Sequence, residues 1–279
     1  MPVRIVTDSA CDLPEAVCDE LGIEVVPLTI RFGEREYVDR KELSTEAFWR
    51  ELETSSVLPE TAAPSVGAFE ETFRRLSDDA ADGIVCINLS GRLSATMQSA
   101  QVAAKALDGQ TPISIIDSLS ASMGIGNLAL YAARRARDGA SLDDIVHGVE
   151  DRRDRQHVFA TVDTLEYLRK GGRIGGAQAL IGSMLSIKPI IEVRDGAVEP
   201  AGKVRTRSKA LQFILDRIPA GQVEAISVLH AAAPEVDEFL AKLEPLVPDA
   251  EVVVGTIGPV VGVHTGPRVI GVAWIQRPE

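Results

Sequence analysis

The sequence is poor in cysteine. Only Cys11, Cys18 and Cys86 occur in 279 residues, and no Cys-x-x-Cys pair is found among them. An odd number of cysteines without metal-ligand spacing argues against a disulfide framework and fits reduced thiols in a cytoplasm. The four histidines are scattered along the chain, so they form no zinc-site motif. From these residues we expect a cytoplasmic protein without a bound metal or other cofactor.

Basic charge and long apolar runs are also scarce. Lysine and arginine total 29 against 41 acidic residues, which gives a net charge of −12. This balance argues against a general nucleic-acid binder and against docking on anionic membranes. No stretch approaches the roughly 18 uninterrupted apolar residues of a membrane span, and the N-terminus lacks the basic-then-apolar pattern of a signal peptide. We therefore expect a soluble, intracellular protein with no membrane anchor.

The apolar segments of the first half alternate with helical patterns. Strand-like runs precede amphipathic segments, and this order is typical of a parallel sheet with helices on both faces. The runs that predict strands are 3–7, 23–30, 84–89 and 113–116. We expect residues 1–155 to form a first α/β domain with a mainly parallel sheet.

The pattern changes after about Arg155. Residues 187–193 and 197–204 are predicted as strands, and Arg194-Asp195-Gly196 between them is a strong hairpin signal. Other predicted elements are strands at 158–162, 225–230, 252–257 and 269–275, with a loop at 258–267. A hairpin among closely spaced strands favours a mixed sheet. The whole chain is therefore predicted to be α/β, with a second α/β domain over residues 156–279.

One predicted strand ends in hydroxyl side chains. Residues 84–89 form an almost unbroken apolar run, and the sequence has helical spacing from Thr96 onward. Ser94 lies at this junction, where an N-cap would be, and the free N–H groups of the first helical turn make such a junction a seat for an anion. The alternative is that Ser94 only caps the helix.

Three polar residues near predicted strand ends are candidates to hold that anion. They are Thr61 in TAAPS, Ser94 in LSATMQSA and His264 in GVHTGP. Loops at strand ends are where α/β proteins bind ligands, and two hydroxyls with an imidazole can converge on one carboxylate. Each residue also has a purely structural interpretation, as a loop hydroxyl, a helix cap and a turn residue respectively.

Enzyme chemistry is the competing interpretation. Ser94 and His264 with an acid would form a hydrolase triad, but the sequence has no Gly-x-Ser-x-Gly elbow. Residues 124–129, GIGNLA, match a dinucleotide fingerprint but begin several residues after the preceding strand, and no P-loop is present. Asp8 and Asp117, each followed by serine, are expected to bond nearby backbone. A hydrolase or a nucleotide-dependent transferase stays the alternative function.

Several segments, in this order and spacing, resemble the DegV family of bacterial lipid-binding proteins over the whole chain. They are VTDSACDLP, TAAPS, LSATMQSA, DSLSASMGIG, TLEYLRKGGRI, SIKPII, KVRTRSKAL and IGPVVGVHTGP. The resemblance implies a two-domain α/β protein that holds one long-chain, palmitate-like fatty acid in a tunnel between the domains. It also implies that Thr61 and Ser94 hold the carboxylate with His264 nearby, in a lipid carrier that is not an enzyme.

Some members of this family, the FakB subunits, present the bound acid to a separate ATP-dependent kinase that makes acyl-phosphate. Basic residues around Arg173 and Arg205 interrupt the acidic chain, and the resemblance implies that they dock such a fatty acid kinase. The chain departs from the family pattern at Ala62, Ala63, Ala95, Met97 and Arg268. The two alanines of TAAPS remove side-chain hydrogen bonds near the head group, and the flexible Met97 is expected to reshape the tunnel.

Overall fold

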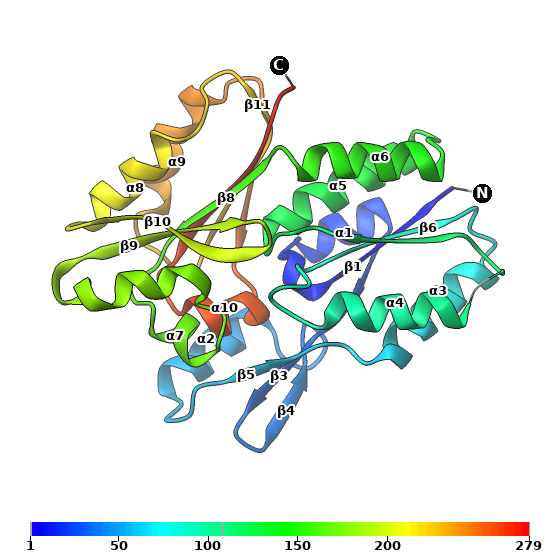
Figure 1. The fold of residues 1–279 in the computed structure, drawn as a ribbon, viewed down its shortest axis with the longest axis horizontal. Coiled ribbons are helices and arrows are strands. Elements are labelled where there is room, and N and C mark those ends of the chain that lie inside the picture. Colours follow the sequence, from blue (N-terminus) through cyan, green and yellow to red (C-terminus); the bar gives the residue numbers. More distant parts are fainter. Residues whose placement is uncertain (1, 108, 279) are drawn as a thin grey trace.

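The computed structural model describes residues 2–107 and 109–278 and shows two α/β halves side by side (Figure 1). The first half contains a four-stranded sheet in the order β2-β1-β6-β7, in which all neighbours are parallel. Its strands are β1 (Arg4–Asp8), β2 (Ile23–Val26), β6 (Ile84–Asn88) and β7 (Ile113–Asp117). The parallel sheet predicted for the first half is therefore confirmed.

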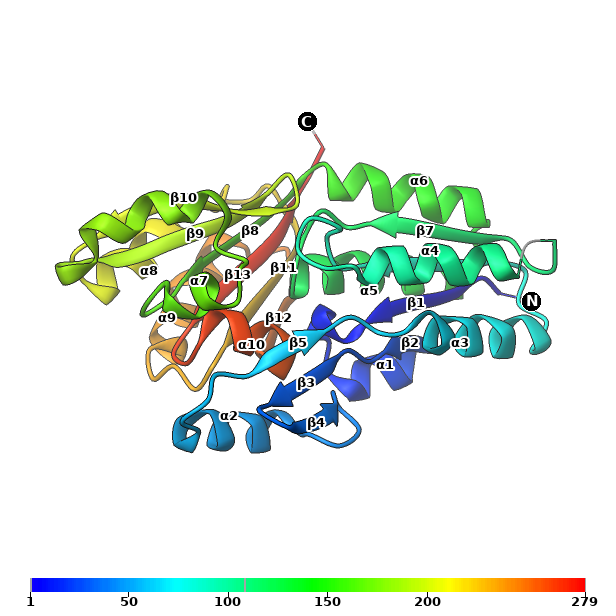
Figure 2. The ribbon, with the colours of Figure 1, turned by 60° about the horizontal axis from the view of Figure 1, so that its bottom comes forward.

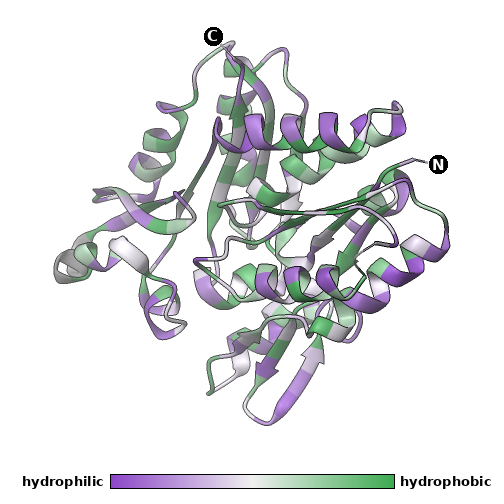
Figure 3. Ribbon diagram, turned by 45° about the vertical axis from the view of Figure 1, so that its right-hand side comes forward, coloured by the Kyte–Doolittle hydropathy of each residue, from purple (hydrophilic) through white to green (hydrophobic). Residues whose placement is uncertain are grey.

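Helices cover both faces of this sheet because its central strands are apolar on both sides. On β6, Ile84 and Cys86 pack with α3 and α4, whereas Val85 and Ile87 pack with α5 and α6 (Figures 1 and 2). Figure 3 shows these helices banded green and purple, as expected of amphipathic helices. The helices of this half are α1 (Glu15–Leu21), α2 (Thr45–Thr54), α3 (Val66–Asp78), α4 (Thr96–Ala106), α5 (Met123–Arg137) and α6 (Leu142–Arg153), with a 3₁₀ turn, η1 (Ser9–Cys11).

A small antiparallel sheet in the first half was not predicted. The apolar run 23–30 was expected to be one strand, and this was wrong: β2 ends at Val26, Pro27 follows, and β3 begins at Thr29. Proline lacks the N–H that would continue the ladder, so the chain leaves the parallel sheet there. The small sheet has the order β4-β3-β5 and consists of β3 (Thr29–Phe32), β4 (Arg35–Val38) and β5 (Glu60–Ala62).

The second half contains a six-stranded mixed sheet, as predicted. Its order is β10-β9-β8-β13-β11-β12, and only β11 and β12 are parallel neighbours. Asp195 and Gly196, at the predicted hairpin, both have positive φ, which matches the right-handed twist of the strands that they join. The strands are β8 (Gln156–Thr161), β9 (Lys188–Arg194), β10 (Ala197–Val204), β11 (Val223–His230), β12 (Val252–Thr256) and β13 (Ile270–Gln276).

The two faces of the mixed sheet have different neighbours. Ile226, Val228 and Trp274 pack with α8 and α9 on the outer face, while α5 of the first half contacts β13 and β11 on the inner face. The chain crosses from one half to the other between α6 and β8. The remaining elements are α7 (Glu166–Lys170), η2 (Gly175–Ser186), α8 (Arg207–Leu215), α9 (Val236–Leu243), η3 (Glu244–Leu246) and α10 (Pro259–Thr265).

The segment 258–267 was expected to be a loop, and the structure shows a helix there. Gly258 is the N-cap of α10, and Pro259 occupies its first position, where the missing N–H of proline is not needed. Gly266, with a φ of 72°, ends the helix. His264 therefore lies in the last turn of this helix. Among the described residues, no helix is long and apolar enough to cross a membrane.

Candidate ligand-binding cavity

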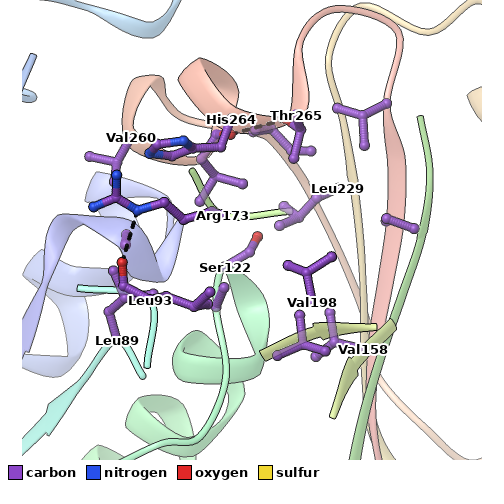
Figure 4. Close-up of a pocket in the computed structure, with 18 of the residues that line it drawn as sticks. Leu89, Leu93, Ser122, Val158, Arg173, Val198, Leu229, Val260, His264 and Thr265 are labelled. Carbon is purple, nitrogen blue, oxygen red and sulfur yellow. Dashed lines mark hydrogen bonds between the residues drawn. The ribbon is translucent and has the colours of Figure 1, made fainter. Parts of the chain in front are cut away.

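A cavity lies between the two halves, against the inner face of the mixed sheet (Figure 4). It contains about 940 Å³ of space free of protein atoms, part of it open to solvent, which is in the range of known ligand sites. The first half contributes Ala10, Leu28, Thr61, Leu89, Leu93, Ser94, Ala121, Ser122 and Met123, and the second half contributes Val158, Ala160, Leu168, Arg173, Ile191, Val193, Val198, Leu229, Ile257, Val260, Val261, His264, Thr265, Val269, Gly271, Val272 and Ala273. Most of these side chains are apolar, so the cavity suits an apolar ligand.

Thr61 and His264 meet at one end of the cavity. Thr61 stands on β5, which pairs with β3 so that Thr61 is opposite Ile30. His264 comes from α10, and its Nε2 lies 3.0 Å from Oγ1 of Thr61. Two residues that are 203 positions apart are thus joined by one hydrogen bond. The structure brings together this predicted pair.

The imidazole of His264 is neutral, and among the described residues only one of its two ring nitrogens has a hydrogen-bond partner. Burial, together with the positive charge of Arg173, lowers the pKa of His264 to about 4. Its Nδ1 is buried and has no hydrogen-bond partner in the part of the chain that the structure describes. A side chain at Gly171 would place its Cβ 2.3 Å from this Nδ1, so the ring occupies space that only a glycine leaves free. We assign the proton to Nε2, since the Nε2–H then donates to Thr61 and leaves the threonine O–H available for a ligand.

Ser94 lines the same cavity but does not cap the following helix. The N-cap of α4 is Ala95, and Ser94 precedes it. Its Oγ accepts a 3.3 Å bond from the backbone N–H of Thr96 and lies 2.9 Å from the hydroxyl of that threonine. The position predicted for Ser94 was therefore wrong by one residue. Its hydroxyl is still half-buried in the cavity wall at the N-terminus of α4.

Arg173 is a cavity residue that sequence reasoning had assigned only to partner docking. Its Nε donates to the carbonyl of Leu93 at 3.1 Å, and its Nη1 donates to the carbonyl of Gly171 at 2.7 Å. These bonds hold the guanidinium beside His264, as Figure 4 shows. A positive charge therefore lies in the wall of an apolar cavity. The basic segment RKGGR indicated a cluster of positive side chains, but it did not show that the guanidinium of Arg173 faces the cavity.

Ser122 also lines the cavity and was not predicted from the sequence. Its hydroxyl takes part in hydrogen bonds that hold the cavity walls together. Its hydroxyl donates a 2.6 Å bond to Oδ2 of Asp12, whose Oδ1 accepts the backbone N–H of Gly258 at 3.0 Å. Burial raises the pKa of Asp12 to about 7. One carboxyl group thus links η1 to the first residues of α5 and α10. Both helices contribute walls to the cavity.

Asp8 and Asp117 bond to nearby backbone, as expected. Asp8 accepts the N–H groups of Ala10 and Leu89, and Asp117 accepts those of Gly91 and Leu119. These bonds fix the turn between β6 and α4, which carries Ser94.

The enzyme alternatives find no support in the geometry. His264 bonds to Thr61, and within residues 2–107 and 109–278 no carboxylate bonds to its Nδ1, so the hydrolase triad is not assembled. The fingerprint-like residues 124–129 lie inside α5 and are buried. Gly126 allows close packing, because a Cβ there would be 2.8 Å from the carbonyl of Cys11. This glycine thus serves helix packing.

The remaining predicted positions lie outside the cavity lining. Arg205 is exposed between β10 and α8. Met97 lies near Gly91 and is not among the residues that line the cavity. Arg268 has a positive φ and pairs with Glu235 at 2.9 Å. Other departures are Ala62, Ala63 and Ala95, none of which is in the lining.

A two-lobed α/β protein with an apolar cavity between a parallel and a mixed sheet is the class that the fold and the site define. A family model described as an uncharacterised protein of the DegV family matches residues 2–277. A DegV domain-containing protein of Streptomyces coelicolor is 40% identical over 99% of both chains. The chain belongs to the DegV family.

Solved structures of similar proteins share the fold. A DegV family protein from Thermus thermophilus, described by its fatty acid binding, matches with a TM-score of 0.91 and 32% identity over 99% of this chain and 100% of that one. DegV of Bacillus subtilis, described as a fatty acid binding protein, matches with a TM-score of 0.90 and 30% identity over the same shares. A stearic acid-binding protein from Eubacterium ventriosum matches with a TM-score of 0.90 and 28% identity, over 99% and 98% of the two chains.

Proposed function

We propose that this protein is a carrier that binds one long-chain, palmitate-like fatty acid in the cavity between its lobes. The observation that carries the proposal is the distribution of polarity: an apolar cavity with a hydroxyl, an imidazole and a guanidinium gathered at one end. The fatty acids named for its structural relatives support it. We assign the lobes to domains 1–155 and 156–279 and place the carrier in the cytoplasm, where its three free cysteines stay reduced.

The tail supplies the affinity in this proposal. A palmitate-like chain has about fourteen methylene groups, and burying each contributes ~0.8 kcal/mol, which gives roughly 11 kcal/mol before association and ordering costs. The lining can accept it, because valine, leucine, isoleucine and alanine form most of the wall. Binding of this kind requires no catalytic group.

The head group must avoid being buried without partners. We assign its carboxylate to the end where Thr61, Ser94 and His264 lie, with Arg173 as the counter-charge. Two of the five N–H donors of Arg173 bond to backbone oxygens, and Nη2, which has no partner among the described residues, can donate to a carboxylate. Donors of this number and charge match a carboxylate better than a neutral ester or alcohol.

Mass spectrometry of lipid extracted from the purified protein tests the proposal. We expect about one fatty acid per chain, and the delipidated protein should bind added palmitate more tightly than its methyl ester. The ester is the matched control, because it keeps the tail and removes the charge. A protein that carries no fatty acid from a lipid-rich host and binds no added palmitate would disprove the carrier function.

We further propose that the carrier presents its fatty acid to an ATP-dependent fatty acid kinase, and that Arg205 helps to dock it. Arg205 is exposed and, among the described residues, has no ion-pair partner. Arg173 was also predicted to dock the kinase, but its place in the cavity wall makes Arg205 the cleaner test. Arg205→Glu should reduce acyl-phosphate formation by a purified fatty acid kinase without changing palmitate binding. Arg50→Glu, an exposed reversal on α2, is the control, and equal activity of both variants would refute the docking role.

A further inference from the structure

The inner face of the mixed sheet has a line of small residues down its two central strands. In one row across the sheet, Leu229, Gly271, Ala160 and Ile191 are consecutive partners on β11, β13, β8 and β9. The two middle residues of this row are small and the two outer ones are large. All four line the cavity. The row therefore has a depression over β13 and β8.

The next row on the same face continues this depression. Ala273 on β13 is opposite Val158 on β8, and Val193 on β9 is opposite Val158. Val158, like Gly271 in the first row, is partly accessible although it lies on a central strand. Accessible surface at such positions shows that the cavity reaches the sheet there. Ala273 is only 4% exposed and the following Ile275 only 1%, so the cavity ends near this second row.

The direction of the depression follows from the chain. α10, which carries His264, leads directly into β13, so Gly271 is nearer the polar end and Ala273 is farther from it. Figure 4 agrees: Leu229 lies between His264 and the distant pair Val158 and Val198. An acyl chain whose carboxylate is at His264 would pass over Gly271 to reach the second row.

Gly271 has room for a Cβ atom, which would clash with none of the described residues. Within 4 Å, an added Cβ would meet the carbonyl oxygen of Phe159 at 3.6 Å and the Cβ of Ala160 at 3.7 Å, both ordinary contacts. Its backbone has no positive φ that would require glycine. Valine is also favoured in strands. The missing side chain thus leaves volume in the cavity, and folding does not demand its absence.

We propose that Gly271, with Ala160 beside it, determines the acyl chain length that this protein accepts. The empty space above these two residues admits the distal part of a long chain to the second row of the sheet. This inference rests on the proposed fatty-acid function and specifies its ligand. A larger side chain at either position would exclude the distal methylenes and leave the site for the head group and first methylenes intact.

The test compares the affinities of palmitate and decanoate, measured by isothermal titration calorimetry, for wild type, Gly271→Val and Ala160→Val. Each excluded methylene should weaken binding about fourfold, so three of them give a loss of roughly 60-fold for palmitate. Decanoate affinity should change by less than about threefold, because the shorter chain does not reach the second row. Ala225→Val is the matched control, since Ala225 is half-buried on the same sheet face but outside the cavity lining.

Each outcome has a distinct meaning. Palmitate affinity of Gly271→Val and Ala160→Val equal to that of wild type would overturn the role of the depression, even with the carrier function intact. Wild-type protein that binds neither acid would instead refute the proposed function. Should Gly271→Val fail to fold, Gly271→Ala carries the same test, with a smaller loss for palmitate and none for decanoate.

Discussion

The low pKa of His264 leads to a quantitative prediction about pH and stability. Burial beside Arg173 lowers this pKa to about 4, whereas a histidine in an unfolded chain titrates at about 6.5. Between these values the unfolded chain binds more protons than the folded one. The free energy of unfolding should therefore rise with pH across this window and stay level above about 6.5. A difference of about 2.5 pKa units corresponds to at most roughly 3 kcal/mol.

Urea unfolding of wild type and His264→Gln between pH 4 and 8 isolates this contribution. Glutamine keeps an amide that can bond to Thr61, so the variant removes the titration more than the contact. Asp12 and the other carboxyl groups titrate in both proteins and cancel in the difference. The stability of wild type relative to the variant should increase by about 2–3 kcal/mol from pH 4 to 6.5. Parallel pH curves for the two proteins would refute the reasoning.

The same measurement with ligand checks the position of the carboxylate. A carboxylate beside His264 favours the imidazolium and offsets the repulsion from Arg173, so the pKa of His264 should rise when palmitate binds. The slope of stability between pH 4 and 6.5 should then become smaller. An unchanged slope at saturating palmitate would place the head group away from His264.

The site supports three shorter predictions. Combining Thr61→Ala with Ser94→Ala should weaken palmitate binding by about 2–4 kcal/mol in calorimetry, because bonds to a charged group are lost; equal affinity would show that the carboxylate binds elsewhere. Gly171→Ala should displace the ring of His264, since the new Cβ would lie 2.3 Å from Nδ1, and the imidazole NMR signals should move; unmoved signals would contradict this packing. The buried Asp12 has a pKa raised to about 7, so between about pH 4 and 7 this carboxyl group is ionised in the unfolded chain but protonated in the folded one. The free energy of unfolding should therefore fall as the pH rises through this window. Asp12→Asn should flatten this fall and be more stable than wild type at pH 8, and urea unfolding that shows the same slope in both proteins would count against it.

The parts of the fold that follow from local pattern were predictable. The run 84–89 is apolar on both sides because helices cover both faces of its sheet, and its position next to Ser94 identified the turn that lines the cavity. Likewise Asp195-Gly196 has the φ values that only a few residue types adopt, so the hairpin was visible in the sequence. In these places a short segment determines its own conformation.

The parts that depend on distant partners were not predictable. β5 is three residues long and exists because β3 pairs with it, so the sequence pattern placed Thr61 in a loop and missed the strand. α10 has seven residues that include three valines and a glycine, a composition with weak helix propensity, and its N-terminus is held by Asp12. The direction of Arg173 depends in part on the carbonyl of Leu93, which is 80 positions away in the turn before α4. Tertiary contacts decide each of these features.

The two lobes are joined at the edge of the cavity through the same turn that carries Ser94. Ser90 donates a 2.7 Å bond to the carbonyl of Gly196, and Arg92 donates a 2.8 Å bond to the carbonyl of Asp195. The tip of the β9–β10 hairpin therefore rests on the turn between β6 and α4. A ligand whose head group binds to this turn and whose tail lies on the mixed sheet adds a further link between the lobes, and it should raise the melting temperature in proportion to the logarithm of its concentration.

The free energies expected for the tail and for the head group of a bound fatty acid differ in size, so the two parts have different roles. Burying the tail contributes roughly 11 kcal/mol before association costs, whereas loss of two hydroxyl partners costs about 2–4 kcal/mol. Variants at the polar end should therefore bind fatty acids more weakly but still bind them. Variants over Gly271 remove tail contacts instead, and they alone should change which chain lengths are accepted. In the proposed carrier, chain-length selectivity is thus a property of the sheet surface, while Thr61, His264 and Arg173 set the position of the carboxylate.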